Sequence, residues 1–364
     1  MPRFIAFYLP QYHPIPENDE WWGPGFTEWL NVARARPLFR GHVQPHLPAD
    51  LGFYDLRLPE TREAQAKLAR EAGIEGFCYY HYWFGPGKRL LERPFEEVVA
   101  SGKPDFPFCL CWANHSWYKK QWDPEAPGKD QILIEQTYSG PEAHERHFRD
   151  LERAFRDPRY MRVDGRLLFF IYDTLTFPDV PGFIRQWNEL ARKAGLGGFY
   201  FVTKDYDSRN KEKILAMGLD AIYNDDARNI HHHLPAWRKA WLWVGRHWLG
   251  RPTVFRYADA MKWMVSDDCR NENVIPSISP NWDHSPRSGS RAMVLTDPDP
   301  DLFRQVAERA LDVVAAKPSD RQLVLIKAWN EWGEGNYMEP DLEHGHGYLD
   351  ALRLAIANKG GKAG

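Results

Sequence analysis

Short apolar segments alternate along the chain with longer segments in which apolar residues recur at helical spacing. Eight apolar segments are rich in β-branched and aromatic residues and are bounded by turn residues. They cover residues 3–10, 75–84, 106–114, 165–173, 198–204, 220–225, 273–279 and 321–330. Most are apolar almost throughout, which is typical of parallel strands that are covered on both faces. The pattern therefore predicts eight parallel strands.

Helical segments separate these strands, most clearly at residues 58–73, 178–195 and 297–317. The first has an acidic start, regularly spaced Ala and Leu and a terminal glycine, and the other two repeat this pattern. Strand and helix alternating eight times predict an α/β fold, a (β/α)8 TIM barrel spanning residues 1–364 as a single domain. A doubly wound open sheet is the alternative, but the sequence has no G-x-G-x-x-G or Walker pattern after an early strand.

Two connections are too long for simple barrel links, at about residues 11–57 and 226–272. Both are rich in tryptophan, which argues against disorder because such side chains bury surface. Long ordered loops in compact domains are usually functional. We therefore expect two long loop insertions at strand ends.

Charge and hydropathy exclude several kinds of partner. The 47 basic and 50 acidic residues give a net charge of −3 and show no basic stripe, so a nucleic-acid partner is not expected. No apolar run approaches the roughly 18 residues needed to span a membrane. The first ten residues lack the features of a signal peptide, which predicts a cytoplasmic protein as written, or a periplasmic or secreted one if a signal had been removed.

No metal or other cofactor is expected. The four cysteines, Cys78, Cys109, Cys111 and Cys269, lack metal-ligand spacing. Cys109 and Cys111 are two positions apart on a predicted strand, so they share a face and are predicted to be small core residues. The adjacent histidines at 231–233 would rarely converge on one ion. The acidic "DPDPD" at 297–301 opens a predicted helix, where acids are favoured anyway.

Aromatic residues are unusually frequent, with 16 Trp, 16 Tyr and 20 Phe, and many stand beside polar residues. Such rings suit packing and also stacking on sugars, so an oligo- or polysaccharide is the expected ligand. Active sites of these barrels lie at the carboxyl ends of the strands. Residues near those ends are the candidate binding residues: Tyr12, His13, Trp22, Tyr79, His81, Tyr82, Trp112, Asn114, Tyr172, Asp173, Asp225, Trp282, Asn330 and Trp332. Alternation along a strand sends about half of such side chains outward, so each has an alternative role in packing.

The segment "KAWNEWGEGNYMEP", residues 327–340, carries the candidate catalytic pair, Glu331 and Glu334. Glycosidic hydrolysis uses two carboxyl groups whose pKa values are held apart. Trp332 would provide the low dielectric that raises the pKa of a neighbouring acid. Two surface acids at a helix start are the alternative, but the position at the end of the last strand favours catalysis.

Four motifs in order, "FYLPQYHPIPENDEWWGPGFTEW", "GFCYYHYWF", "CWANHSW" and "KAWNEWGEGNYMEPD", resemble the WbsX-type family over residues 3–352. The family is commonly described as putative glycosyltransferases of polysaccharide gene clusters. It is similar, more distantly, to the endo-α-mannosidases of glycoside hydrolase family 99, whose E-W-x-E motif matches residues 331–334. Gly333 departs from that motif, in which a larger residue is usual.

The resemblance implies a barrel that acts on glycans without a metal or nucleotide cofactor. It implies that Glu331 is a base that deprotonates the sugar 2-hydroxyl, and that Glu334 protonates the leaving group and later activates water. The leading hypothesis is a retaining glycoside hydrolase that cleaves a polysaccharide or O-antigen-like glycan, with a mannose-like sugar as one candidate. A glycosyltransferase of polysaccharide biosynthesis and a non-catalytic glycan-binding protein are the alternatives.

Overall fold

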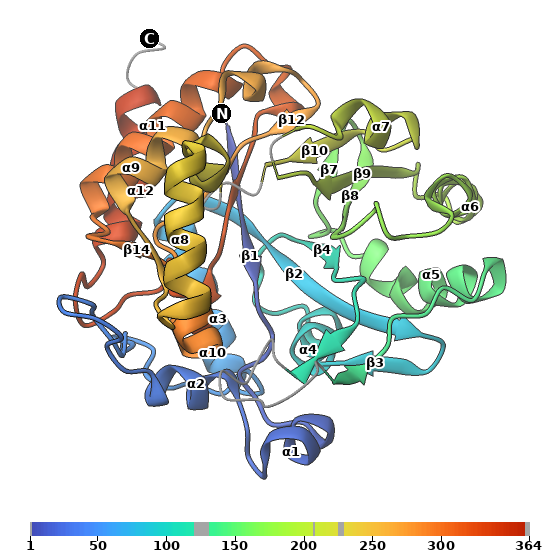
Figure 1. Cartoon of the computed structure of the whole chain (residues 1–364). Coiled ribbons are helices and arrows are strands. Elements are labelled where there is room, and N and C mark those ends of the chain that lie inside the picture. The colour runs from blue at the N-terminus through green and yellow to red at the C-terminus, as the bar shows by residue number, and fades with distance from the viewer. Residues whose placement is uncertain (1, 120–130, 207, 225–228, 361–364) are drawn as a thin grey trace.

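A parallel β-sheet curled into a barrel forms the centre of the computed structural model, which describes residues 2–119, 131–206, 208–224 and 229–360 (Figure 1). Its strands follow the order β12-β10-β9-β8-β4-β2-β1-β15-β13. In chain order these are β1 (Arg3–Tyr8), β2 (Ile74–Gly85), β4 (Phe108–Trp112), β8 (Arg166–Ile171), β9 (Phe199–Lys204), β10 (Ala221–Tyr223), β12 (Val274–Ile275), β13 (Ser277–Ile278) and β15 (Leu323–Ile326). Each lies within or overlaps one of the eight predicted strands.

The seventh predicted strand is divided into β12 and β13 by Pro276. β12 pairs with β10 on one side and β13 pairs with β15 on the other, so the sheet returns to its starting point. Proline cannot donate a hydrogen bond to a neighbouring strand, but the carbonyl of Pro276 still accepts one from the Leu325 amide at 2.9 Å. The predicted (β/α)8 barrel is confirmed, with its seventh strand in two pieces.

Helices surround the barrel, as Figure 1 shows. They are α3 (Pro59–Glu71), α4 (Arg93–Ser101), α5 (Pro141–Phe155), α6 (Val180–Lys193), α7 (Lys211–Ala216), α11 (Pro300–Val314) and α12 (Gly347–Gly360). α3, α6 and α11 begin one to three residues inside the helical segments predicted from sequence. Asp299, within the acidic "DPDPD", accepts hydrogen bonds from two amides of the first turn of α11 and so caps that helix. Among the described residues, no group of three His, Cys, Asp or Glu side chains is arranged to hold a metal.

Both long connections contain secondary structure of their own. Residues 11–57 carry α1 (Pro16–Trp22) and α2 (Glu28–Arg34). The described part of 226–272 carries α8 (Ala236–Trp248), β11 (Thr253–Arg256) and α9 (Tyr257–Ala260), and β11 pairs with β14 (Met293–Thr296). No helix in the described part of the chain is both long and apolar enough to cross a bilayer.

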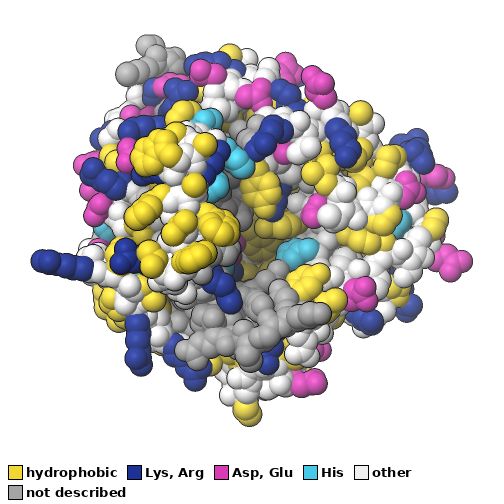
Figure 2. All heavy atoms as spheres, viewed as in Figure 1, with side chains coloured by type: hydrophobic (Ala, Val, Ile, Leu, Met, Phe, Trp, Pro, Cys, Tyr) yellow, Lys and Arg dark blue, Asp and Glu magenta, His cyan; other side chains and the backbone are white. Residues whose placement is uncertain are grey.

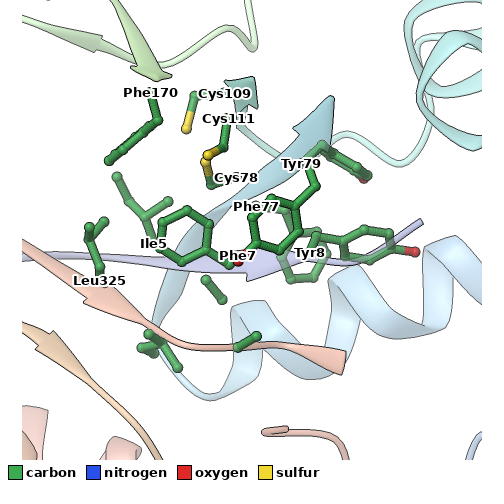
Figure 3. Close-up of a cluster of buried hydrophobic side chains, with 14 of the residues drawn as sticks. Ile5, Phe7, Tyr8, Phe77, Cys78, Tyr79, Cys109, Cys111, Phe170 and Leu325 are labelled. Atoms are coloured by element: carbon green, nitrogen blue, oxygen red, sulfur yellow. The ribbon is translucent and has the colours of Figure 1, made fainter. Parts of the chain in front are cut away.

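Aromatic and sulfur-containing side chains fill the core (Figure 3). Phe7 on β1 stacks on Tyr80 of β2, with ring centroids 5.4 Å apart, and meets Phe170 of β8 edge to face. Cys78, Cys109, Cys111 and Cys269 are all buried and free, and the prediction that Cys109 and Cys111 are small core residues is confirmed. Close packing of this kind tolerates little added volume.

Gly76 on β2 provides a test of that packing. A Cβ added there would lie 2.6 Å from the carbonyl oxygen of Pro107 and 2.8 Å from the sulfur of Met161. We expect Gly76→Ala to lower the free energy of unfolding by about 1–3 kcal/mol, measured by urea denaturation. Gly245→Ala in α8, where an added Cβ meets nothing within 4 Å, is the matched control and should be neutral or slightly stabilising. Equal effects of the two substitutions would contradict the packing described here.

Candidate active site

The segment that carries the two candidate acids forms a short loop at the carboxyl end of β15. After Ile326 the chain enters β16 (Asn330–Glu331), makes a single 3₁₀ turn at Trp332–Glu334 and returns along β17 (Asn336–Tyr337). β16 and β17 pair antiparallel. The acids therefore lie on a tight loop at the end of the last strand, as the catalytic interpretation requires.

Asn330 anchors this loop to the end of β1. Its side chain accepts a hydrogen bond from the Leu9 amide at 2.7 Å and donates one to the Leu9 carbonyl at 3.0 Å. The Tyr12 hydroxyl donates to the Asn330 carbonyl at 2.6 Å and accepts from the Trp332 amide at 3.1 Å. These buried bonds fix the backbone on either side of Glu331.

Asp283 holds the other side of the loop. Its amide donates to the Glu334 carbonyl at 2.7 Å, and Gly335 adopts φ +57° where a Cβ would lie 2.7 Å from the Asp283 Cβ. Its carboxylate lies 2.7 Å from His42 Nε2 and accepts from Gln44 Nε2 at 2.6 Å. Burial alone would raise the pKa of Asp283, but these hydrogen bonds outweigh it and lower that pKa. The side chain is thus a carboxylate that keeps the loop in place.

Glu331 and Glu334 face one cavity of about 140 Å³ at the carboxyl ends of the strands. Its aromatic wall comes from four parts of the chain: Tyr80 and Tyr82 of β2, Trp117 after β4, Tyr172 after β8 and Trp282 after β13. Polar groups of His115, His284, Lys327 and Arg287 complete the wall. Flat apolar rings with a few convergent polar groups are typical of small-ligand sites, and such rings stack well on sugars.

Arg287 on α10 (Ser285–Ser288) lies between three glutamates. Its Nη1 lies 2.5 Å from Glu334 Oε1 and 3.7 Å from Glu331 Oε2, and its Nε lies 2.9 Å from Glu28 Oε1. Glu28, the first residue of α2, is completely buried. A Cβ on Gly333 would overlap the Glu28 carboxylate, so this ion pair and a larger residue at position 333 exclude each other.

The two acids differ in their pKa values because Arg287 lies closer to Glu334 than to Glu331. Burial, together with the negative charge of Glu334, raises the pKa of Glu331 to about 8. Burial acts on Glu334 in the same direction, but Arg287 and His284 outweigh it and hold its pKa well below the usual range. The opposite directions of the two shifts favour a proton on Glu331 and a charge on Glu334.

A third glutamate, Glu339, supports the loop from behind. It accepts hydrogen bonds from Trp332 Nε1 at 2.6 Å, Gln65 Nε2 at 2.6 Å and the Tyr54 hydroxyl at 2.8 Å. Burial raises the pKa of Glu339 to about 7 despite these donors. It is too deeply enclosed to contact a ligand, so its effect on the site is to orient Trp332.

Three of the predicted binding residues line the cavity with the two glutamates: Tyr82, Tyr172 and Trp282. Asn330 and Trp332 belong to the loop itself, and the Tyr12 hydroxyl bonds to the backbone of both, as described above. Asn114 and Asp173 link two strand ends, because the Asn114 side chain bonds to both the amide and the carbonyl of Asp173. The ligand-binding role of all these residues stays a prediction.

The remaining candidates lie away from the cavity. Tyr79, His81 and Trp112 point towards the surrounding helices, where Tyr79 packs on Phe95 and His81 lies 2.8 Å from His147. This corrects the expectation for β2, whose even-numbered Tyr80 and Tyr82 face inward, because strand residues alternate between faces. His13 is buried and Trp22 packs on Phe26, neither of them in the cavity wall. Asp225 lies outside the described residues.

Arg287, Lys327 and Glu28 were not predicted. The ammonium group of Lys327 lies 5.1 Å from the centre of the Trp282 ring. Lys327 begins the segment quoted for the two glutamates, and this closeness to Glu331 in the sequence could have indicated a role in the site. Glu28 and Arg287 are 259 positions apart and meet only because α2 folds back over the barrel mouth. No local pattern in the sequence indicates that pair.

The chain belongs to the family described as "Glycosyltransferase WbsX", whose sequence profile matches residues 4–352. Its sequence is similar to the uncharacterized WxcX proteins of two Xanthomonas campestris pv. campestris strains, and each is 38% identical over 362 residues. That alignment covers 97% of the chain but 49% of the relatives, so the chain spans about half of their length.

Two solved structures show the same fold. An endo-α-mannosidase of glycoside hydrolase family 99 from Bacteroides thetaiotaomicron superposes with a TM-score of 0.59 at 14% identity, covering 100% of this chain and 99% of that one. A structure titled "Glycoside hydrolase-like protein" superposes with a TM-score of 0.56 at 14% identity, covering 97% and 93%. The family description and both titles concern proteins of glycan metabolism.

The raised pKa of Glu331 predicts a pH-dependent stability. Between the ordinary glutamate pKa of 4.5 and about 8, the folded chain keeps a proton that the unfolded chain releases, so stability falls as pH rises through this window. Glu331→Gln has no such titrating group, so its stability should not fall in this way. We expect the free energy of unfolding of the variant, relative to that of the parent, to increase by on the order of 3 kcal/mol from pH 5 to pH 8. Chemical denaturation at both pH values measures the change.

The control is Glu145→Gln on the exposed face of α5, where Glu145 pairs with Arg149. It should change stability by a few tenths of a kcal/mol at both pH values. A Glu331→Gln variant whose stability parallels that of the parent at pH 5 and pH 8 would show that Glu331 is ionised in the folded protein.

Proposed function

We propose that this protein is a retaining glycoside hydrolase that acts on an oligo- or polysaccharide. The observation that carries the proposal is a pair of buried carboxyl groups, one protonated and one ionised, facing an aromatic cavity at the mouth of a barrel. Glycosidic cleavage needs this combination, because one group must give a proton to the departing oxygen while the other acts as base or nucleophile.

The spacing of the two acids supports retention of the anomeric configuration. Glu331 Oε2 and Glu334 Oε1 both lie close to Arg287 Nη1, at 3.7 and 2.5 Å, so the sum of these distances is the upper limit of their separation. The two carboxyl groups are also close enough for a hydrogen bond between them, whereas those of inverting enzymes are roughly 6.5–9.5 Å apart and leave room for a water. Two closely spaced acids suit a mechanism in which the sugar 2-hydroxyl or a carboxylate attacks the anomeric carbon.

The charges support particular roles for the pair. Glu331 holds the proton and is suited to donate it to the leaving oxygen, while Glu334, held ionised by Arg287, is suited to accept a proton from the sugar 2-hydroxyl. These roles are the reverse of those that the resemblance to the mannosidases implies. The reason lies in the ion pair: protonating Glu334 would break its bond to Arg287 and leave that cation with less charge compensation in a buried site.

A glycosyltransferase is the second candidate, because the family description uses that term. A transferase would need to bind an activated sugar donor, commonly a nucleotide sugar. Titration calorimetry with a set of nucleotide sugars separates the two candidates. Binding of one of them that is lost in Glu331→Gln would favour the transferase.

The roles of the two acids are tested by single substitutions assayed on natural glycans and on aryl glycosides with good leaving groups. Glu331→Ala should lose about 10²–10⁴-fold in rate on a glycan, since proton donation contributes about that much, but far less on an aryl glycoside that leaves unprotonated. Glu334→Ala should lose activity on both substrates. Glu145→Ala on α5 is the control and should retain full activity.

Three results are possible besides the expected one. If Glu334→Ala is the variant that keeps activity on the aryl glycoside, the roles are those implied by the mannosidase resemblance. If both variants cleave a glycan at the parent's rate, these residues are not catalytic. If nuclear magnetic resonance of the first product shows an inverted anomer, the retaining mechanism is wrong.

A further inference from the structure

Helix α8 is the most unusual surface feature outside the cavity. Its residues Trp237, Trp241, Val244 and Trp248 follow the spacing i, i+4, i+7 and i+11, which places them in one line along the helix. Their exposed fractions are 72%, 65%, 36% and 78%. Scattered exposed apolar residues are ordinary, but a continuous stripe of large rings marks an interaction surface.

The helix is oriented with this apolar stripe towards solvent. Leu242, which lies on another face of the helix, packs against the hydrophobic core and fixes that orientation. Figure 2 shows the resulting group of hydrophobic side chains over α8, beside a hollow near the centre of the same face. The stripe of Trp237, Trp241, Val244 and Trp248 is named the tryptophan stripe below.

Basic residues lie near the tryptophan stripe. At 100° per residue, Arg238 lies beside the stripe, whereas Lys239 and Arg246 lie on the opposite face of the helix. Residues 229–258 contain no Asp or Glu but include five basic side chains, Arg238, Lys239, Arg246, Arg251 and Arg256, although the whole chain carries a net charge of −3. Arg238 and Arg251 are exposed. Two acids outside this segment act on it: Asp297 lies 3.7 Å from Arg256, and Asp259 interacts electrostatically with Arg256 and Arg238. The region is therefore locally cationic on an otherwise slightly acidic protein.

We propose that α8 docks the protein on an anionic lipid bilayer, with the tryptophan stripe inserted at the level of the headgroups and the neighbouring Arg238 and Arg251 near the lipid phosphates. Indole rings prefer this interface because they combine an apolar body with a polar N–H. A helix with Trp on one face and Lys or Arg beside it is the usual form of an interfacial anchor. Negative surface potential adds attraction for each basic side chain near the membrane.

The charge pattern favours a bilayer over the other possible occupants. A second copy of the chain would place two cationic segments against each other, because a two-fold interface brings the same patch from both partners together. A neutral glycan would use the rings but not the basic residues beside them. An anionic bilayer uses both sets of side chains.

Co-sedimentation with lipid vesicles tests the proposal without any enzymatic assay, so its outcome is separate from that of the proposed function. The parent protein should pellet with phosphatidylcholine vesicles that contain phosphatidylglycerol, and binding should weaken at high salt. Trp237→Ser/Trp248→Ser should reduce the partition coefficient roughly tenfold or more. Arg238→Gln/Arg251→Gln should reduce it about tenfold through lost charge alone.

Leu342→Ser/Leu354→Ser is the matched control, since these leucines are also exposed, at 69% and 51%, but lie outside α8. It should bind vesicles like the parent, and thermal unfolding should show that all variants are folded. Equal binding to vesicles without phosphatidylglycerol, or unchanged binding of the tryptophan variant, would overturn the proposal. So would absence of vesicle binding combined with a tryptophan-dependent dimer in light scattering, or with tryptophan-dependent binding of a soluble polysaccharide.

Discussion

The contact between Arg287 and the carboxylate of Glu334 determines the chemistry of the whole site. Both side chains are enclosed by the barrel mouth, where an ion pair interacts strongly and an unpaired charge is costly. Arg287 is itself held by the buried Glu28, so its guanidinium cannot turn away from Glu334. As a consequence Glu334 is ionised, and its charge together with burial leaves the proton on Glu331.

The barrel strands and the two long connections each contribute different residues to this region of the molecule. β15 and the loop after it provide the two acids, and the ends of β1 and β13 fix that loop through Leu9 and Asp283. The first connection contributes α2 with Glu28, and also His42 and Gln44, which hold Asp283. The second connection contributes α8, whose exposed rings lie outside the cavity that holds the two glutamates. A common fold thus obtains its particular site from residues in the connections.

The barrel could be predicted from sequence because a buried parallel strand leaves a local trace, a short apolar run between turns. Glu331 and Glu334 could be found because they follow such a run within one short segment. The sequence predicts that side chains along β2 alternate between two faces, but not which face is inward. The structure was therefore needed to show that Tyr80 and Tyr82, rather than Tyr79 and His81, point towards the cavity. Glu28 and Arg287 meet through tertiary folding alone. The outward tryptophans of α8 were expected to be buried, because composition does not show which face of a helix packs.

The protonation of the pair is the centre of this account, and nuclear magnetic resonance of ¹³C-labelled glutamate carboxyl groups measures it directly. Glu331→Gln and Glu334→Gln assign the two signals, and a pH titration of the unliganded parent gives their state. The account predicts that the Glu331 carboxyl stays protonated at pH 7 and titrates near pH 8, while the Glu334 carboxyl is ionised throughout. Two ionised carboxylates at pH 7, or a proton on Glu334, would contradict it.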